Sequence, residues 1–215
     1  MLIEDNLLII APAILGLVLT IWSVLLYRDK KSPSLIFIAG IACLVSSICI
    51  HPLSSAQVRT VLFNNAGAIT QVAFSPKQGA TDLVLKTINS ANKYIYVAAY
   101  AFTSKPIANA LLEAHNRGID VKIVLDNSQK NGNGNLLEYL RQYGIPTRIN
   151  SKYKIMHNKF MIVDGLTIQL GSFNYTKSAE ESNAENVLVV SNNYALVTAY
   201  LNQWQKFWSE SKDLK

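Results

Sequence analysis

The stretch from Ile155 to Asn186 constrains the fold of this chain more than any other part of the sequence. The pattern from Lys159 to Val163 predicts a β-strand, and Asp164-Gly165 is typical of a tight hairpin turn. Thr167 to Leu170 is expected to form the returning strand. In such a hairpin, the residues that follow the second strand lie beside the residues that precede the first strand.

Four polar side chains are expected to converge at the open end of this hairpin. Side chains alternate between the two faces of a strand, so His157 and Lys159 share a face. Ser172 and Asn174 follow the returning strand and can lie beside them. This set suits a phosphodiester, because the ammonium supplies charge, the hydroxyl and carboxamide supply neutral donors, and the imidazole is a nucleophile or proton carrier.

The spacing of these residues is H-x-K-x4-D-x6-G-S-x-N, counted from His157 to Asn174. This string resembles the HKD motif of the phospholipase D superfamily. With the S-A-E-E-S-N-A-E-N that follows, it is similar to the small single-motif branch, which includes bacterial periplasmic endonucleases of the Nuc type and short proteins labelled phospholipase D. The likeness covers about Phe74 to Trp208.

The resemblance implies a metal-independent phosphodiesterase that forms a phosphohistidine intermediate on His157. Glu185 lies where such proteins place a carboxylate that orients the imidazole. Asp164 belongs to the motif, and its position in a turn suits a structural role. The residues that would hold the phosphate oxygens are Lys159, Ser172 and Asn174, and the full candidate catalytic set is His157, Lys159, Asp164, Ser172, Asn174 and Glu185.

A single catalytic histidine leaves this chemistry half complete. Displacement at phosphorus needs one group to attack and another to protonate the departing oxygen from the opposite side. The histidine at position 115 has no motif around it. The economical solution, which the resemblance also implies for single-motif members, is a homodimer in which two such hairpins meet across a two-fold axis and share the active site.

The first 57 residues are predicted to anchor the chain in a membrane. Residues 6–27 carry no charge and are long enough to cross a hydrocarbon core, and residues 35–53 form a second apolar segment. Three basic residues in the turn between them place that turn in the cytoplasm by the positive-inside rule. The catalytic domain, residues 58–215, would then face the periplasm from the inner membrane.

A cleaved secretory leader is the alternative interpretation of this region. Arg28 to Lys31 would form its basic start, Leu35 to Ile50 its apolar core, and Ser54-Ser55-Ala56 its cleavage site. Both interpretations put the catalytic domain on the same side of the membrane. They differ in whether the domain stays tethered or is released after cleavage near Ala56, and the long apolar segment before the basic turn favours tethering.

Composition limits the kinds of site that the catalytic domain can hold. Both cysteines, Cys43 and Cys49, lie in the second apolar segment, so residues 58–215 have no disulfide, thiolate nucleophile or cysteine-ligated zinc. The only histidines of this domain are His115 and His157, too few for a histidine metal cluster. We therefore expect neither a metal nor a cofactor.

The excess positive charge lies entirely on the catalytic domain. The first 57 residues are balanced in charge, so the net charge of +6 belongs to the remaining 158 residues, with 17 basic and 11 acidic side chains. Such a domain attracts polyanions, either nucleic acid or an anionic lipid surface. Lys152, Lys154 and Lys177 put part of this charge close to the motif in sequence.

Strands alternate with helices along the domain, which predicts an α/β fold with a mixed β-sheet sandwiched by helices, the phospholipase D-like fold of the resemblance. Besides the hairpin, the expected strands are 69–74, 94–100, 119–125, 146–149 and 186–191, and the expected helices are 81–91, 104–116, 136–143 and 194–208. Residues 126–134 are expected to form a polar loop.

The sequence favours a phosphodiesterase of the nuclease type, a nonspecific endonuclease, because the short, basic, single-motif form resembles such enzymes. A phospholipase D that hydrolyses phospholipid head groups is the alternative, since tethering keeps the site close to lipid. A catalytically silent, membrane-tethered module that binds nucleic acid is a third hypothesis. The complete set of candidate catalytic residues argues against it, because a binding module needs no nucleophile.

Overall fold

The computed structural model of this protein describes residues 59–61, 67–130 and 136–213. The predicted membrane anchor therefore lies outside the described residues. Among the helices that are described, none combines the length and the apolar character that crossing a membrane requires.

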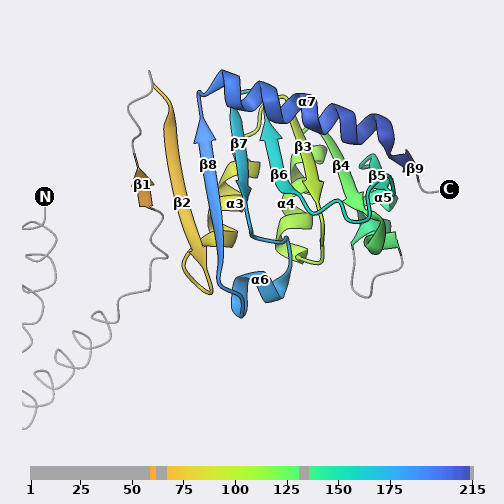
Figure 1. Ribbon diagram of the computed structural model, residues 1–215, viewed down its shortest axis with the longest axis horizontal. Helices are drawn as coiled ribbons and strands as arrows, with labels where there is room; N and C mark the ends of the chain where they lie inside the picture. The colour runs from red at the N-terminus through yellow and green to blue at the C-terminus, as the bar shows by residue number, and fades with distance from the viewer. Residues whose placement is uncertain (1–58, 62–66, 131–135, 214–215) are drawn as a thin grey trace, which may run out of the picture. The chain divides into compact units, whose positions relative to one another are not determined.

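A mixed β-sheet forms the centre of the described domain (Figure 1). Its strands lie in the order β1-β2-β8-β7-β6-β3-β4-β5-β9. The pairs β3–β4 and β4–β5 are parallel, and the other pairs are antiparallel. The strands are β1 Arg59–Val61, β2 Ile69–Ser75, β3 Tyr94–Ala99, β4 Asp120–Asp126, β5 Thr147–Asn150, β6 Lys159–Val163, β7 Thr167–Gly171, β8 Glu185–Ser191 and β9 Lys212–Asp213.

Helices cover both faces of this sheet (Figure 1). On one face lie α3, Ala80–Asn89, and α4, Lys105–Asn116, and across the other runs α7, Tyr194–Glu210. Three shorter helical segments, η1 Asn127–Lys130, α5 Leu137–Gln142 and α6 Lys177–Glu181, lie in the connections. The predicted α/β fold with a mixed, helix-sandwiched sheet is confirmed for this domain.

The period-2 pattern of β6 divides its side chains between two apolar clusters. Met161 and Val163 join the cluster under α3 and α4, whereas Phe160 and Ile162 join the cluster under α7. Burial in these clusters stabilises the fold by about 25 cal/mol for every Å² of apolar surface removed from water. The hairpin is therefore held from both sides, and the residues at its ends are placed by a packed sheet.

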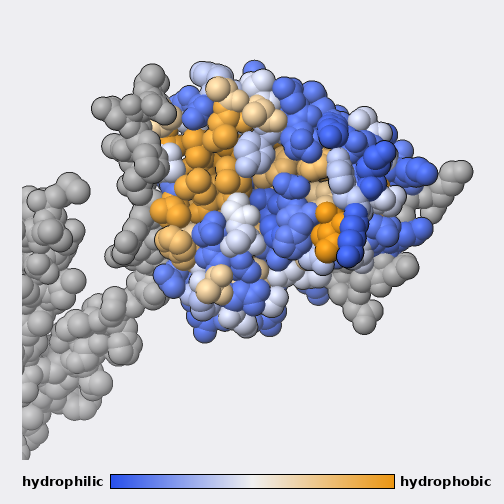
Figure 2. Space-filling view, viewed as in Figure 1, coloured by the Kyte–Doolittle hydropathy of each residue, from blue (hydrophilic) through white to orange (hydrophobic). Residues whose placement is uncertain are grey.

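The face that carries α7 is not completely covered by that helix. Figure 2 shows hydrophobic side chains gathered over β2, β8 and β7 on this face. Val72, Leu170 and Leu188 are half-buried there, and Phe74 is 44% exposed. Phe74 lies opposite Asn186 in the β2–β8 register, because Ala73 pairs with Val187 and Ser75 with Glu185. This apolar surface, which we call the open face, therefore extends to the end of β8 where Glu185 lies.

The expected strands and helices all form, with bounds that differ by a few residues from the prediction. Four short elements were not predicted: β1, β9, η1 and α6. The η1 turn occupies the start of the expected polar loop, and α6 begins where the Thr176 side chain accepts a hydrogen bond from the backbone N–H of Ala179 at 3.2 Å. Elements this short carry little hydrophobic periodicity, so tertiary contacts and caps decide them.

Candidate active site

Lys159 lies at the start of β6, opposite Ala99 at the end of β3. Its side chain is buried, with 7% exposed. The Nζ atom donates a hydrogen bond to the backbone carbonyl of His157 at 2.8 Å and lies 5.1 Å from the centroid of the Tyr100 ring. An ammonium has three donors, and among the described residues only this one hydrogen bond is made, so two donors remain for an anion.

Burial lowers the pKa of Lys159, because desolvation disfavours its charged form, and the nearby Glu185 carboxylate acts in the opposite sense. Glu185 begins β8, and its Oε1 accepts a hydrogen bond from Nδ2 of Asn183 at 3.2 Å. Within the described residues, no carboxylate lies within ion-pair distance of the Lys159 ammonium. The ammonium thus lacks a close counter-ion, and a bound phosphate group can provide one.

The imidazole of His157 is exposed at this end of the sheet. It contacts the ring of Tyr100, with ring centroids 4.5 Å apart and an angle of 57° between the planes. The backbone before it is fixed, because the N–H of Met156 donates to the buried carboxylate of Asp126 at 2.7 Å. The same carboxylate accepts from the N–H of Ser128 at 2.9 Å. His157 therefore combines a tethered backbone with an accessible nucleophilic side chain.

Ser172 and Asn174 follow β7 and alternate with two buried aromatic residues, Phe173 and Tyr175. The aromatic rings anchor the segment in the core, while Ser172 is exposed and Asn174 is half-buried. Ser172 Oγ accepts a hydrogen bond from the N–H of Asn186 at 3.1 Å. Asn174 Oδ1 is buried without a hydrogen-bond partner among the described residues, and such an unsatisfied acceptor costs about 1–3 kcal/mol.

Hydrogen bonds join this segment to the one that follows β3. The carbonyl oxygen of Tyr175 accepts from the N–H groups of Thr103 at 2.8 Å and Ser104 at 2.9 Å. The Tyr175 hydroxyl donates to Oε1 of Gln169 at 2.5 Å. The end of β3, the start of β6, the end of β7 and the start of β8 therefore meet at one end of the sheet. That end carries the predicted site residues His157, Lys159, Ser172, Asn174 and Glu185.

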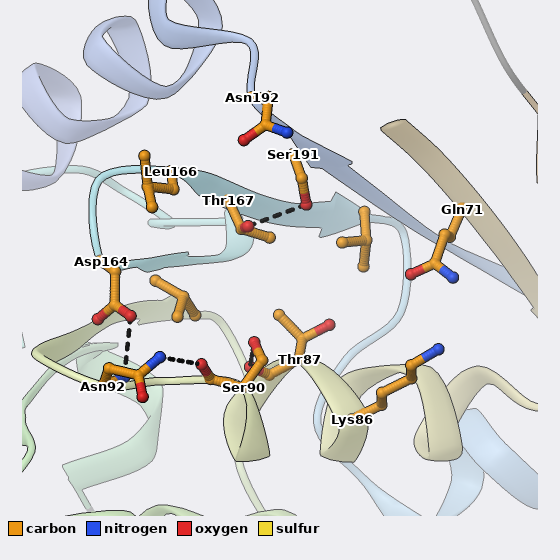
Figure 3. Close-up of a pocket in the computed structure, with 12 residues that line it drawn as sticks. Gln71, Lys86, Thr87, Ser90, Asn92, Asp164, Leu166, Thr167, Ser191 and Asn192 are labelled. Atoms are coloured by element: carbon orange, nitrogen blue, oxygen red, sulfur yellow. Dashed lines mark hydrogen bonds between the residues drawn. The ribbon is translucent and has the colours of Figure 1, made fainter. Parts of the chain in front are cut away.

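Asp164 lies at the other end of β6, about 16 Å along the strand from Lys159. Its carboxylate accepts the backbone N–H groups of Asn92 and Lys93, each at 2.8 Å, and of Tyr94 at 2.9 Å. Figure 3 shows Asp164 and its hydrogen bond to Asn92 beside a cavity of about 320 Å³, which Leu166 also lines. The carboxylate joins the hairpin turn to the start of β3, so the structure does not bring Asp164 to the catalytic cluster.

The electrostatics of Asp164 agree with a structural role. Burial alone raises the pKa of this carboxyl, but hydrogen bonds from the backbone N–H groups of Tyr94, Asn92 and Lys93 outweigh that effect and hold the pKa below its usual value. The turn position expected from the sequence therefore describes what Asp164 does, and its place among the candidate catalytic residues is not supported by this geometry.

Two residues of the site were missed by the sequence reasoning, Tyr100 and Asp126. Tyr100 follows β3 and Asp126 ends β4, and the carboxyl ends of both strands lie at the end of the sheet that carries His157. Polar or aromatic residues at such strand ends often contact ligands in α/β folds, which is the signal that could have found them. In the part of the chain that the structure describes, no three His, Cys, Asp or Glu side chains are grouped as metal ligands would be.

An accessible imidazole beside a buried ammonium with free donors, at the end of an α/β sheet, suits phosphoryl-group chemistry. The matching family is described as "Cardiolipin synthase, PLD-like domain", and it matches residues 84–208. The chain belongs to the phospholipase D superfamily, as its motif predicts.

Two relatives of known name cover much of the domain. A protein named phospholipase D from Rickettsia prowazekii is 34% identical over 153 residues, which span 71% of this chain and 74% of the relative. A protein named mitochondrial cardiolipin hydrolase from Chlamydomonas reinhardtii is 35% identical over 128 residues, which span 60% of this chain and 57% of the relative.

A solved structure is also similar to this chain. The crystal structure of the phospholipase D family member Nuc from Salmonella typhimurium has a TM-score of 0.67 and 41% sequence identity, and the match covers 69% of this chain and 99% of that chain. These similarities confirm the prediction of a phospholipase D-like fold and of a phosphodiester hydrolase of this superfamily.

Proposed function

We propose that this protein is a nonspecific endonuclease that cleaves nucleic acid without a metal ion, through a phosphohistidine intermediate on His157. The observation that carries the proposal is the exposed imidazole of His157 beside the buried ammonium of Lys159, which makes one hydrogen bond among the described residues. The excess of basic side chains on residues 58–215 and the 41% identity with Nuc favour nucleic acid as the substrate.

In the first half of the reaction, a nitrogen of His157 attacks phosphorus and the bond from phosphorus to the leaving oxygen breaks. The leaving oxygen takes its electron pair and accepts a proton from the partner's His157. Lys159 and the donors of Ser172 and Asn174 bind the non-bridging oxygens, whose negative charge grows in the transition state. The product of this half is a phosphohistidine and a free alcohol.

In the second half, a water molecule attacks phosphorus while the partner's imidazole, now neutral, takes its proton. The bond from phosphorus to nitrogen breaks, and the electron pair returns to His157. Both imidazoles end in their initial protonation states, so the cycle consumes only water. Glu185 would assist through its carboxylate charge, which favours the cationic forms of nearby groups.

The second imidazole implies a homodimer, and the open face offers a surface for a second copy of the chain. Its half-buried Val72, Leu170 and Leu188 and its exposed Phe74 are apolar, and the face extends to the strand end that carries Glu185. A two-fold contact through this surface would bury apolar area and set two copies of the exposed His157 near each other.

Phospholipase D activity is the second candidate function. Ile155 is 50% exposed, two residues before His157, where it could contact the apolar part of a phospholipid. The relatives named phospholipase D and mitochondrial cardiolipin hydrolase also favour this alternative.

We also propose that the predicted anchor in residues 1–57 holds the catalytic domain on the periplasmic side of the inner membrane. Protease added to spheroplasts should then digest the domain while cytoplasmic proteins survive. Release of the domain into the soluble fraction, with a new amino terminus near residue 56, would support the cleaved leader instead.

The deciding experiment incubates the full chain, in mild detergent and excess EDTA, with plasmid DNA and separately with phosphatidylcholine or cardiolipin vesicles. We expect DNA cleavage that persists in EDTA and is lost in His157→Ala. His115→Ala is the matched control, because that half-buried histidine at the end of α4 should leave cleavage unchanged. Cleavage of lipid alone would select the phospholipase, and inhibition by EDTA would contradict the metal-free mechanism.

A further inference from the structure

Within one subunit, the side-chain contact of the His157 imidazole is with an aromatic ring. Among the described residues, none donates a hydrogen bond to the imidazole ring or accepts one from it, and Oε1 of Glu185 is paired with Asn183 instead. The ring contact of His157 is with Tyr100, at 4.5 Å between centroids. Lys159 Nζ lies 5.1 Å from the same aromatic centroid. Tyr100 therefore contacts both the proposed nucleophile and the cation that would bind phosphate.

The backbone around Tyr100 is held on both sides. Before it, β3 is paired with β6 up to the Ala99–Lys159 pair. After it, the N–H of buried Phe102 donates to Oε1 of Gln129 at 3.1 Å, and Thr103 is bonded to the Tyr175 carbonyl. The tyrosine ring is half-buried between these anchors. The backbone that carries this ring is therefore fixed beside His157.

We propose that Tyr100 is a positioning residue whose ring holds the His157 imidazole in the orientation needed to attack phosphorus. The inference rests on the proposed phosphohistidine mechanism and deepens it. Attack requires reacting atoms about 3–3.5 Å apart with aligned orbitals, so a rotating imidazole spends most of its time unable to react. The negative face of an aromatic ring also attracts cations, which keeps the Lys159 ammonium beside the imidazole and favours the positive charge that His157 gains during attack.

The kinetic test compares Tyr100→Leu with Tyr100→Phe in the full chain, with bis(p-nitrophenyl) phosphate as substrate. We expect Tyr100→Leu to lower kcat by about 10- to 100-fold with less than about a threefold change in KM, because ground-state binding is retained while alignment is lost. Tyr100→Phe keeps the ring and should retain kcat within about threefold. A drop in both variants would assign the effect to the hydroxyl and overturn the proposal, as would a rise in KM alone.

Tyr143→Leu is the matched control. That tyrosine is 53% exposed at the end of α5, and its ring packs on Tyr139 with centroids 5.0 Å apart. The control should leave kcat unchanged. All three variants should unfold at temperatures near that of the wild type, which separates lost alignment from lost folding.

A measurement without substrate separates this inference from the proposed function. In protein labelled with ¹³C-histidine, the His157 signals can be assigned by their absence in His157→Ala, since the chain has three histidines. We expect Tyr100→Leu to move the His157 ring resonances, because the aromatic ring current is lost, and Tyr100→Phe to leave them in place. Unchanged His157 resonances in Tyr100→Leu would overturn the inference even if the protein cleaves DNA. A wild-type protein that cleaves no diester would refute the proposed function instead.

Discussion

Lys159 shows how a residue can be costly for stability and useful for binding at the same time. Its buried ammonium loses hydration, and the lowered pKa of Lys159 records that this loss exceeds the attraction of Glu185. A charged group that the protein solvates incompletely is ready to bind an anion, since the anion restores what burial removed.

We expect Lys159→Met to raise the midpoint of thermal unfolding while reducing phosphodiester cleavage by about 100-fold or more. Because the folded-state pKa of Lys159 is lowered, the unfolded chain holds this proton more tightly. The destabilisation is therefore present at neutral pH and is relieved only as pH rises through the lowered pKa. Differential scanning calorimetry at pH 7 measures the change, with the exposed Lys86→Met as control. A lower midpoint for Lys159→Met would mean that the attraction to Glu185 outweighs desolvation.

Asp164 is expected to matter for stability and little for chemistry. Asp164→Ala should lower the free energy of unfolding by about 1–2 kcal/mol, because three backbone N–H groups lose a charged acceptor. Cleavage at the far end of β6 should stay within about threefold of wild type. Urea denaturation, paired with the cleavage assay, separates the two effects.

The pH dependence of this variant follows from the lowered pKa of Asp164. The stabilisation requires the ionised carboxylate, so it is complete above the unfolded-state pKa, near 4, and declines as pH falls through the folded-state pKa. The stability difference between wild type and Asp164→Ala should therefore narrow below about pH 4. A difference that stays constant down to pH 2 would contradict this account.

At the scale of elements, the β7–β8 pair holds the hydroxyl and carboxamide of the site in place. Gly171 ends β7 with φ of 146°, and a Cβ atom there would collide with the backbone oxygen of Asn186. This close approach lets the N–H of Asn186 reach Ser172 Oγ at 3.1 Å. Glycine at position 171 is therefore a requirement of the site as well as of the strand end.

Gly171→Ala should force β8 away from β7, with a loss of about 1–3 kcal/mol in unfolding free energy and about 100-fold in cleavage rate. Gly118→Ala is the matched control. That residue also has a positive φ, 88°, but nothing lies within 4 Å of its added Cβ. It should lose stability through backbone strain and keep its cleavage rate. Equal activities in the two variants would show that the β7–β8 approach is not needed for catalysis.

At the scale of the whole molecule, the candidate site is built from one end of a single sheet and holds one histidine, His157, of the described domain. The end of β3 and the starts of β6 and β8 meet there, and the domain's other histidine, His115, lies in the last turn of α4. The proposed two-imidazole reaction therefore needs a second chain, and we propose that this chain binds the apolar open face.

Mixed dimers test this arrangement. If wild-type and His157→Ala chains are unfolded together and refolded in equal amounts, cleavage per total chain should fall to about one quarter, because only dimers with two intact histidines react. Independent subunits would give about one half. Phe74→Glu should shift the protein toward monomers in light scattering, and the exposed Tyr143→Glu should not.

The sequence by itself determined the fold class, the hairpin and the set of candidate phosphate-binding side chains. Period-2 patterning and the Asp-Gly turn are local signals, and the order of elements follows from them. The spacing between His157 and Asn174 was sufficient to predict that four of the candidate site residues lie at the same end of the sheet. The same motif also placed Asp164 among the candidate catalytic residues, because the spacing of a motif does not show that Asp164 and Lys159 lie at opposite ends of one strand.

Only the tertiary structure decided how the side chains are used. The contact of Tyr100 with His157 and the hydrogen bond from the Met156 N–H to the Asp126 carboxylate join segments that are far apart in the sequence. Burial of Lys159 likewise depends on how β3 and β6 pair. Such features arise when strands that are distant in sequence end at the same end of a sheet. Hydrophobic periodicity shows which face of a strand a side chain lies on, but it does not show which other strands lie next to it.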